Sequence, residues 1–420
     1  MKIDFLYPEI KGVEIPNKNF WGRYTLAARK AEQDPAELIR AALFNPIGAE
    51  PLEKRIKKGD QVLILADDNT RSTPVEQILK VLLPVLNKIG VRRGDIKILI
   101  ALGTHRPMTK PELIAKLGEW VVEQYQVENH RWAQQADNLY YGQTARGIKV
   151  YGNKQLKAAD LIIGLGHIVP HRVAGFSGGG KIVQPGVCTG ETTGQTHWLS
   201  AQVSGEEIMG KRDNPVREEI DQAARLIGLD YIVNVVQNSA GQIIGVFAGD
   251  FIAAHRAGCE LAREVYGVKI PQADIVITDS YPADLELWQA AKGIYTAELV
   301  LKKGGVVILV TPCPEGIATT HPEVEKYGYS SLARVKTLIS SGQLTELSVA
   351  AHLVHVGRVI KEKGSGIMVS PGIPEQTIKK IGFIPADTVD QALTYALAQK
   401  GLHSSVIVLL NAGEMLPLVE

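Results

Sequence analysis

The chain has 420 residues, of which 45% are apolar and 22% are charged, and its formal net charge is +1. This composition is that of an ordinary globular protein, and the length favours two domains over one. Because the net charge is near zero and like charges form no block, neither nucleic acid nor an anionic membrane is expected as a partner.

The cysteines and the first residues of the chain predict a cytoplasmic protein. Cys188, Cys259 and Cys313 are far apart and form no C-x-x-C pair, which favours a reducing compartment. The N-terminus carries Asp4 and Glu9 and lacks an apolar core, so it does not resemble a signal peptide. No apolar run approaches the roughly 18–20 residues that a membrane span needs.

Through its first part the chain alternates short β-branched runs with amphipathic helical stretches. Strands are expected at residues 62–66, 96–101, 161–164 and 231–236, and helices at 75–89, 110–117, 214–226 and 252–266. Apolar strands that alternate with helices predict an open, mainly parallel sheet. Ligands of such sheets bind beyond the carboxyl ends of the strands.

A second βα series begins after Pro271, which breaks the preceding helix. Strands are expected at 275–278, 305–310, 366–369 and 406–410, and a helix at 285–301. The predicted fold is therefore α/β, with two domains at 1–268 and 269–420, each a mainly parallel sheet flanked by helices.

A glycine-rich segment stands between the third and fourth expected strands. It places His171 ten residues before Lys181, with Gly175, Gly178, Gly179 and Gly180 between them. Glycines let a backbone adopt left-handed dihedrals and approach a bound group, often an anion. Another histidine, His197, follows in Gly194-Gln-Thr-His-Trp198.

The same segment satisfies the G-x-x-x-x-G-K pattern of nucleotide-binding loops, from Gly175 to Lys181. However, Ile182 stands where such a loop needs Ser or Thr, and the preceding strand ends too early. Ordinary NTP binding is disfavoured, while a phosphate- or nucleotide-binding module without turnover stays open. A dehydrogenase is disfavoured because no G-x-G-x-x-G opens a helix after a strand.

Several polar residues follow expected strands or share a helix and are candidates for chemistry. His105 and His171 can supply a base and an acid on two sides of a substrate. Arg71 has the fork that grips a carboxylate or phosphate, although a surface ion pair explains it equally well. Gln289 and Lys292 share one helical face, which suits either a solvated face or a carboxylate clamp.

The remaining histidines carry weaker signals. Structural roles are expected for His130, His255, His403, His352 and His355. His321 lies in a turn before Pro322 and suits either role.

Several separated motifs occur in order along most of the chain. They are Asp68-Asn-Thr-Arg71, Gly103-Thr-His-Arg-Pro107, His171 with Ala174-Gly-Phe-Ser-Gly-Gly-Gly-Lys181, and Trp288-Gln-Ala-Ala-Lys-Gly293, with scaffold segments at 244–250 and 254–258. Together they resemble the nickel-pincer lactate racemase family.

The resemblance implies a cofactor. It is nickel in a pyridinium-3-thioamide-5-thiocarboxylic acid mononucleotide, the nickel-pincer nucleotide, tethered to Lys181 and with His197 as the nickel ligand. Square-planar nickel suits an imidazole beside sulfur and carbon donors, and a tether fixes the reacting ring. Further cofactor contacts are expected at Asp68, Thr70, Ser177, Gly178 and Gly179. Cofactor-synthesis proteins are expected partners for loading.

The family's chemistry is reversible hydride transfer from a small-molecule 2-hydroxy acid, through a 2-keto acid. His105 and His171 match its two acid–base positions. The substrate-binding positions match Arg71, Gln289, Lys292 and Trp288. The active site is expected in the cleft between the two domains.

The sequence departs from the lactate racemase pattern at several positions. Gly180 stands where Arg is often found, Arg172 and Val173 replace aromatic residues, and Trp288 replaces Tyr. A substrate larger than lactate is therefore expected, with lactate itself as the alternative. Arg172 also offers a cation to a second carboxylate, as in malate.

Overall fold

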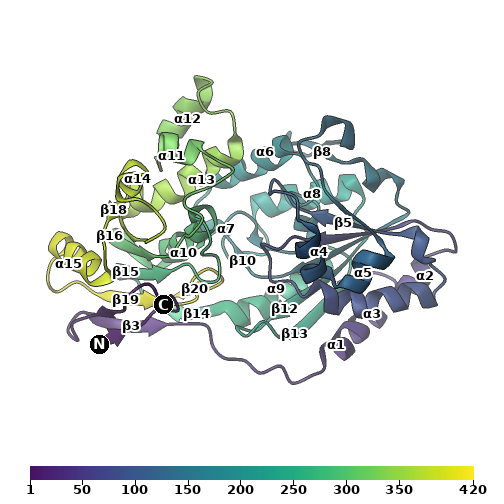
Figure 1. The fold of residues 1–420 in the computed structure, drawn as a ribbon, viewed down its shortest axis with the longest axis horizontal. Coiled ribbons are helices and arrows are strands. Elements are labelled where there is room, and N and C mark those ends of the chain that lie inside the picture. Colours follow the sequence, from purple (N-terminus) through teal and green to yellow (C-terminus); the bar gives the residue numbers. More distant parts are fainter. The chain divides into compact units, whose positions relative to one another are not determined.

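A computed structural model of the protein describes residues 1–420, which divide into two compact units. The N-terminal unit comprises Ala28–Thr196 and Gly210–Val265, and the C-terminal unit comprises Met1–Ala27, His197–Met209 and Tyr266–Glu420. Each unit contains a six-stranded sheet with helices around it (Figure 1). The predicted α/β class with mainly parallel sheets is confirmed.

The sheet of the N-terminal unit has the strand order β13-β12-β9-β4-β5-β6. Its strands are β4 (Val62–Asp67), β5 (Ile96–Ala101), β6 (Gln126–Asn129), β9 (Leu161–His167), β12 (Tyr231–Gln237) and β13 (Ile243–Gly249). All neighbours pair in parallel except β12 and β13. The chain runs from β4 outward to β6 and then returns to β9 on the other side of β4. Loops after β4 and β9 therefore lie at the switch point where such sheets bind ligands.

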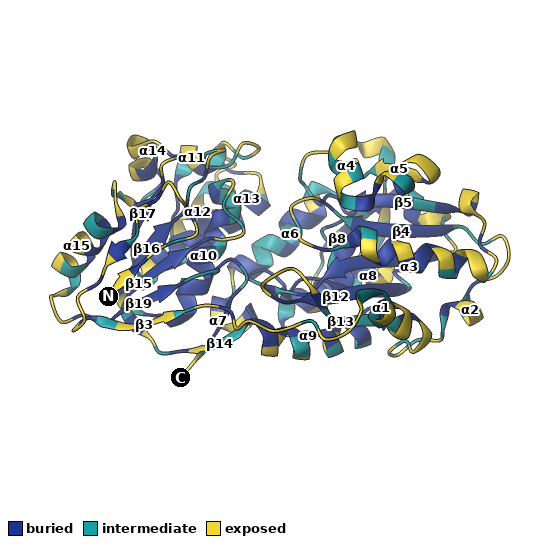
Figure 2. Cartoon of the chain, turned by 60° about the horizontal axis from the view of Figure 1, so that its bottom comes forward, coloured by how far each residue is buried: buried dark blue, intermediate teal, exposed yellow.

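Helices cover both faces of this sheet, because alternate strand residues point to opposite sides. Ile64 and Ile163 belong to an apolar cluster with α1 (Pro35–Phe44), α3 (Val75–Lys88), α4 (Lys110–Leu117) and α5 (Glu119–Gln124). Leu63 and Ile162 belong to a second cluster with α8 (Pro215–Ile227) and α9 (Ala253–Tyr266). Figure 2 shows buried strands and exposed outer helix faces. None of the helices combines the length and apolar character needed to cross a lipid bilayer.

The sheet of the C-terminal unit is fully parallel, in the order β18-β17-β16-β15-β19-β3. Its strands are β3 (Phe20–Tyr24), β15 (Ala273–Asp279), β16 (Leu301–Val310), β17 (Gly364–Val369), β18 (Ile384–Pro385) and β19 (Val406–Leu409). Ile277, Ile308 and Val408 share its core with Leu393 of α15 (Val389–Lys400). Helix α10 (Leu287–Val300) follows β15, and α13 (Leu347–Gly357) precedes β17.

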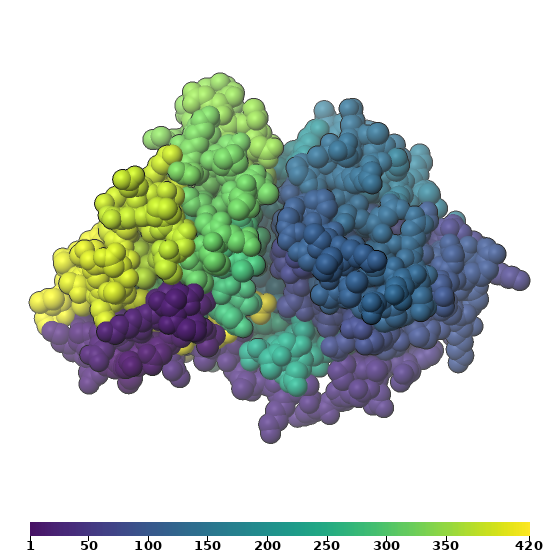
Figure 3. Space-filling model, viewed as in Figure 1, coloured from purple at the N-terminus to yellow at the C-terminus, as the bar shows by residue number.

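The compact units group two segments differently from the predicted domains at 1–268 and 269–420. Residues 1–27 join the C-terminal unit because β3 pairs in parallel with β19, and Figure 3 shows this segment beside the last part of the chain. Residues 197–209, which include the end of α6 (Gly190–Ala201), join it as well. The local sequence pattern could not predict this grouping, because β3 is short and its partner β19 lies at the other end of the chain. The predicted placement of the active site between the domains stays a prediction.

Candidate active site

A carboxylate–imidazole pair lies after β4 and β5 at the carboxyl edge of the N-terminal sheet. One oxygen of Asp68 accepts from the Thr70 hydroxyl at 2.5 Å, and the other lies 2.6 Å from Nδ1 of His105. Because the carboxylate accepts the Nδ1 proton, Nε2 of His105 keeps its lone pair and is available as a base. Burial alone would raise the pKa of Asp68, but the hydrogen bond and charge of His105 hold that pKa well below its ordinary value.

Arg71 lies on the same loop. Its Nη1 donates to the Thr70 hydroxyl at 2.9 Å and to the Thr70 carbonyl at 3.2 Å. Lys116 of α4 donates to the Arg71 carbonyl at 2.7 Å and pairs with Asp67 at 2.9 Å. The loop backbone is thus tied to α4, and the Arg71 side chain is half-buried beside it.

His171 differs from His105 because its Nδ1 accepts a hydrogen bond, whereas Nδ1 of His105 donates one. It ends β10 (Pro170–His171), which forms a hairpin with β11 (Gly175–Phe176) after β9. The backbone N–H of Val173 donates to His171 Nδ1 at 3.1 Å. Since Nδ1 accepts there, a neutral His171 carries its proton on Nε2. In their neutral forms, His105 therefore presents a lone pair at Nε2 and His171 presents an N–H at Nε2.

The glycines before Lys181 are required by close packing of the protein itself. Gly175, Gly178 and Gly179 have φ angles of 79°, 75° and 58°. A Cβ at Gly178 or Gly179 would lie 2.7 Å from a side-chain atom of Asn234 or His255, respectively. Gly178 and Gly179 therefore pack closely against the buried side chains of Asn234 and His255.

Lys181 lies in a short 3-10 turn, η4 (Gly179–Ile182), and is half-buried. Nucleotide-binding loops instead run from a strand directly into an α-helix, whereas β9 ends at His167 and a hairpin intervenes. A Cβ at Gly180 would lie 2.8 Å from Asp221 Oδ1 and 3.1 Å from the Ala224 Cβ. A side chain at position 180 would therefore require Asp221 and Ala224 of α8 to shift.

His197 lies on the part of α6 that belongs to the C-terminal unit, near two other histidines. Burial lowers the pKa of His352 to about 3, and the charges of His321 and His197 contribute to that shift. No group of three or more His, Cys, Asp or Glu side chains is arranged to hold a metal ion. A nickel ion at His197 would thus need donors from a bound organic group.

Trp288 lies at the start of α10 in a stack of rings. Its ring centroid lies 4.2 Å from that of His321 and 4.1 Å from that of His352. His352 Nδ1 lies 3.0 Å from the Tyr295 hydroxyl, and Nε2 lies 3.1 Å from the Tyr329 hydroxyl. Both ring nitrogens are thus engaged, which fixes the imidazole against the indole.

Gln289 and Lys292 follow on α10, and both are half-buried. Burial raises the pKa of Glu414, in the loop after β19, and the charge of Lys292 opposes that rise. Lys292 therefore has a carboxyl group near it within the C-terminal unit.

Comparison with known proteins identifies the family. Residues 8–209 match the lactate racemase N-terminal domain, and residues 268–414 match the lactate racemase C-terminal domain. The lactate racemase of Lactiplantibacillus plantarum is 31% identical over 420 residues, which cover 94% of each chain. This chain belongs to the lactate racemase family. A further lactate racemase, from Thermoanaerobacterium thermosaccharolyticum, is 33% identical over 310 residues, or 72% of each chain.

Solved structures agree with this membership. The lactate racemase apoprotein from T. thermosaccharolyticum has a TM-score of 0.89 and 28% identity, with 100% of both chains covered. A protein from Thermotoga maritima with 23% identity and a TM-score of 0.75 shares the fold over 94% of this chain and 100% of its own. As a lactate racemase family member, the chain is an enzyme of the isomerase class.

The structure divides the predicted site residues between the units. The N-terminal unit holds His105, His171 and Lys181, together with Asp68, Thr70, Arg71, Ser177, Gly178 and Gly179. The C-terminal unit holds His197, Trp288, Gln289 and Lys292. Direct hydrogen bonds join Asp68, Thr70, Arg71 and His105 into one group.

Several residues that support these groups carry little or no signal in the sequence. The sequence pattern predicts only structural roles for His352 and His255, and it predicts no role for Arg217, Asn234 or Glu414. The spacing of His352 and His355 on one helix was the available signal for the ring stack. Arg217 gave none, because a charged residue on an amphipathic helix usually faces solvent.

Proposed function

We propose that the protein racemises or epimerises a 2-hydroxy acid with a nickel-pincer nucleotide attached to Lys181. The observation that carries the proposal is the pair of histidines held in opposite hydrogen-bonding states, in a chain of the lactate racemase family. When bound, the cofactor supplies a site that accepts and returns a hydride. The chain's own residues bind the substrate and move its proton.

His105 and His171 handle the hydroxyl proton. Nε2 of His105 takes the proton from one enantiomer, because Asp68 accepts from Nδ1 and stabilises the resulting imidazolium. Nε2 of His171 returns a proton to the substrate oxygen when His171 is an imidazolium, which becomes neutral as it gives the proton. An imidazolium carries a proton on Nδ1 as well, so the bond from Val173 to His171 Nδ1 must open during turnover in both directions.

We assign the substrate carboxylate to Arg71 and Lys292, with Gln289 as a further hydrogen-bonding group. A buried carboxylate needs a cationic partner, and the Arg71 fork can grip both of its oxygens. Burial raises the pKa of the nearby Glu414, and the charge of Lys292 opposes that rise, so Lys292 already lies near one carboxyl group of the C-terminal unit.

The residues fit the cofactor at two positions. Lys181 is half-buried in a short turn and can serve as the tether, and His197 offers one imidazole to nickel. Thr70, Ser177, Gly178 and Gly179 stay proposed contacts. Asp68 we assign to positioning His105, because both of its oxygens are already engaged by Thr70 and that imidazole. Loading by cofactor-synthesis proteins and a cytoplasmic location also stay proposals.

The proposed substrate is a 2-hydroxy acid larger than lactate, because Val173 is smaller than the aromatic residue of the lactate racemase pattern. Arg172 is buried next to it, which keeps a dicarboxylic acid such as malate as a further candidate. A panel of lactate, 2-hydroxyisovalerate, phenyllactate, malate and gluconate tests this. Highest kcat/KM on lactate would show that these replacements do not set specificity.

The hydride mechanism is tested with a substrate deuterated at the 2-carbon. Because the hydride leaves and returns without meeting solvent, racemised product should keep its deuterium in ordinary water. Complete loss of the label during racemisation would indicate direct deprotonation at carbon and would contradict the proposal. A binding protein without turnover, the alternative, would give no racemisation with loaded protein.

A further inference from the structure

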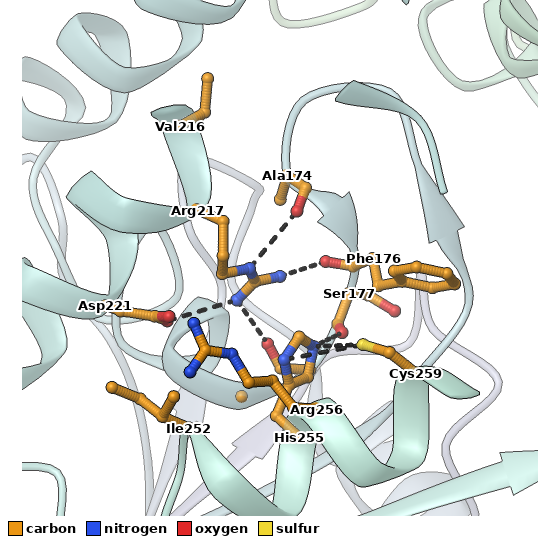
Figure 4. A network of polar contacts seen from close by, with 12 residues as sticks. Ala174, Phe176, Ser177, Val216, Arg217, Asp221, Ile252, His255, Arg256 and Cys259 are labelled. Carbon is orange, nitrogen blue, oxygen red and sulfur yellow. Dashed lines mark hydrogen bonds and ion pairs between the residues drawn. The ribbon is translucent and has the colours of Figure 1, made fainter. Parts of the chain in front are cut away.

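The glycine loop before Lys181 directs its carbonyl groups toward two buried side chains (Figure 4). Arg217 of α8 donates from Nε to the Ala174 carbonyl at 3.3 Å and from Nη1 to the Gly178 carbonyl at 3.1 Å. Its Nη2 donates to the carbonyl of Phe176. One guanidinium therefore holds three carbonyls of a single short segment.

His255 of α9 holds the carbonyl of Ser177, which lies between two of these. Its Nε2 lies 2.9 Å from that oxygen. Burial, together with the charge of Arg217, keeps the pKa of His255 well below its ordinary value, so the ring is neutral and has one N–H to donate. Asn234 of β12 accepts from the Gly179 N–H at 2.7 Å. The loop is thus fixed through both its carbonyl and its amide groups.

The guanidinium is deeply buried and has a counter-charge. The Arg217 side chain is 3% exposed, and its Nη1 lies 3.7 Å from Asp221 Oδ1, one helical turn further along α8. Burial raises the pKa of Asp221 to about 6, although the charge of Arg217 opposes that rise. Burying a charge this far carries a desolvation cost, which its hydrogen bonds to the loop must offset.

A single atom connects this network to Lys181. The Gly178 carbonyl accepts both from Arg217 Nη1 and from the backbone N–H of Lys181, at 3.1 and 3.2 Å. The turn that carries the lysine is therefore built on a carbonyl that the guanidinium orients.

We propose that Arg217 is a positioning residue for Lys181, which fixes the lysine's backbone turn so that its amine meets the group it is to bond. The inference rests on the proposed tether function. Lysine cannot replace this arginine, because one ammonium cannot span three carbonyls that a planar fork with five N–H donors reaches together.

The test compares Arg217→Lys with a matched control, Arg256→Lys. Arg256 lies on α9 next to His255, is exposed, and pairs with Asp213 rather than with the loop. In protein without cofactor, Arg217→Lys should speed hydrogen exchange of the Lys181 amide by roughly tenfold, since a buried bond network is lost. It should also raise the rate at which an amine-acylating reagent labels Lys181, relative to Lys211. The control should match the wild type in both.

The same variants are then produced together with the cofactor-synthesis proteins. Because misplacement of a reacting group by about 1 Å can cost on the order of a hundredfold in rate, the modified fraction of Lys181 should fall at least several-fold in Arg217→Lys. Unchanged exchange, labelling and modification in a folded Arg217→Lys variant would overturn the inference. If Lys181 of the wild type is never modified, the proposed tether function is wrong. Hydrogen exchange of the Lys181 amide and acylation of its amine would still show whether Arg217 positions Lys181.

Should Arg217→Lys fail to fold, the wild type itself provides the test. Under weakly denaturing conditions, the Arg217 Nε–H and the Lys181 amide should exchange with the same opening free energy, because they open together. Free exchange of the Lys181 amide while the Arg217 Nε–H stays protected would overturn the inference.

Discussion

The N-terminal and C-terminal units hold their site residues by different means. In the N-terminal unit, short polar loops are fixed by buried hydrogen bonds, as at Asp68 with His105 and at Arg217 with the glycine loop. In the C-terminal unit, Trp288 on α10 is fixed by stacking against His352, which is held between two tyrosine hydroxyls. A hydrogen bond fixes the position of one atom through its distance and angle, whereas two stacked rings can shift slightly and stay in contact. Proton transfer should therefore depend most on the hydrogen-bonded loops of the first unit, whereas a change in the ring stack of the second should affect substrate preference more than rate.

The largest effect is expected for Lys181→Ala. Activity should be lost completely because no other lysine lies in the η4 turn, while the melting temperature should stay close to that of the wild type. Racemisation assays and thermal unfolding check both halves of this prediction. Lys211→Ala, at an exposed position before α8, is the matched control and should stay active. Activity in Lys181→Ala would place the chemistry elsewhere.

The next effect is expected for the proton-transfer pair. His105→Gln and His171→Gln should each lower kcat/KM by roughly a hundredfold or more, a usual size for acid–base catalysis. Both directions of racemisation should fall equally, because the two enantiomers interconvert through the same steps. Asp68→Asn should cost roughly tenfold to a hundredfold, as loss of an orienting partner does. If Asp68→Asn is as active as the wild type, racemase activity does not depend on the proton positions that the structure favours on His105 and His171.

The stability of the N-terminal unit should depend on pH through the buried residue His130. His130 donates from Nε2 to the Cys188 carbonyl at 3.0 Å and accepts from Asn153 at Nδ1, at 3.1 Å. Burial lowers the pKa of His130 to about 4, against about 6.5 in an unfolded chain. The unfolded state therefore binds the extra proton first, and stability should fall as the pH drops from about 6.5 to about 4.

The loss from His130 should approach about 3 kcal/mol, as an order of magnitude, at the acid end of that window. Chemical unfolding at several pH values between neutrality and that end measures it. His130→Gln should flatten the pH dependence, whereas the exposed control His403→Gln should leave it unchanged. The same slope in His130→Gln and in the wild type would show that the acid sensitivity comes from other groups.

The smallest effect is expected in the ring stack of the C-terminal unit. Tyr329→Phe removes one hydroxyl partner of buried His352 and should cost about 1 kcal/mol of stability. Because Trp288 can adjust its stacking, kcat should change by no more than about threefold, whereas the ratio of kcat/KM between phenyllactate and lactate should shift. An unchanged ratio, with lowered stability, would make the stack purely structural.

Sequence analysis predicted the two parallel sheets and most of their strands, because buried strands such as β4 and β5 are continuous apolar runs. It also placed His105 and His171 after strands; the structure has His105 after β5, and it has His171 after β9 as the last residue of the short strand β10. It could not predict that β3 pairs with β19, since such pairing depends on contacts far apart in the chain. Nor could it find Arg217, whose role appears only when three loop carbonyls converge on it.

Peptide mapping by mass spectrometry, on enzyme produced with the cofactor-synthesis proteins, shows whether Lys181 carries the cofactor. The peptide that contains Lys181 should carry a single added mass, and its abundance should rise in proportion to racemase activity across preparations. Fully active enzyme with unmodified Lys181, or with the added mass on another lysine, would contradict the account.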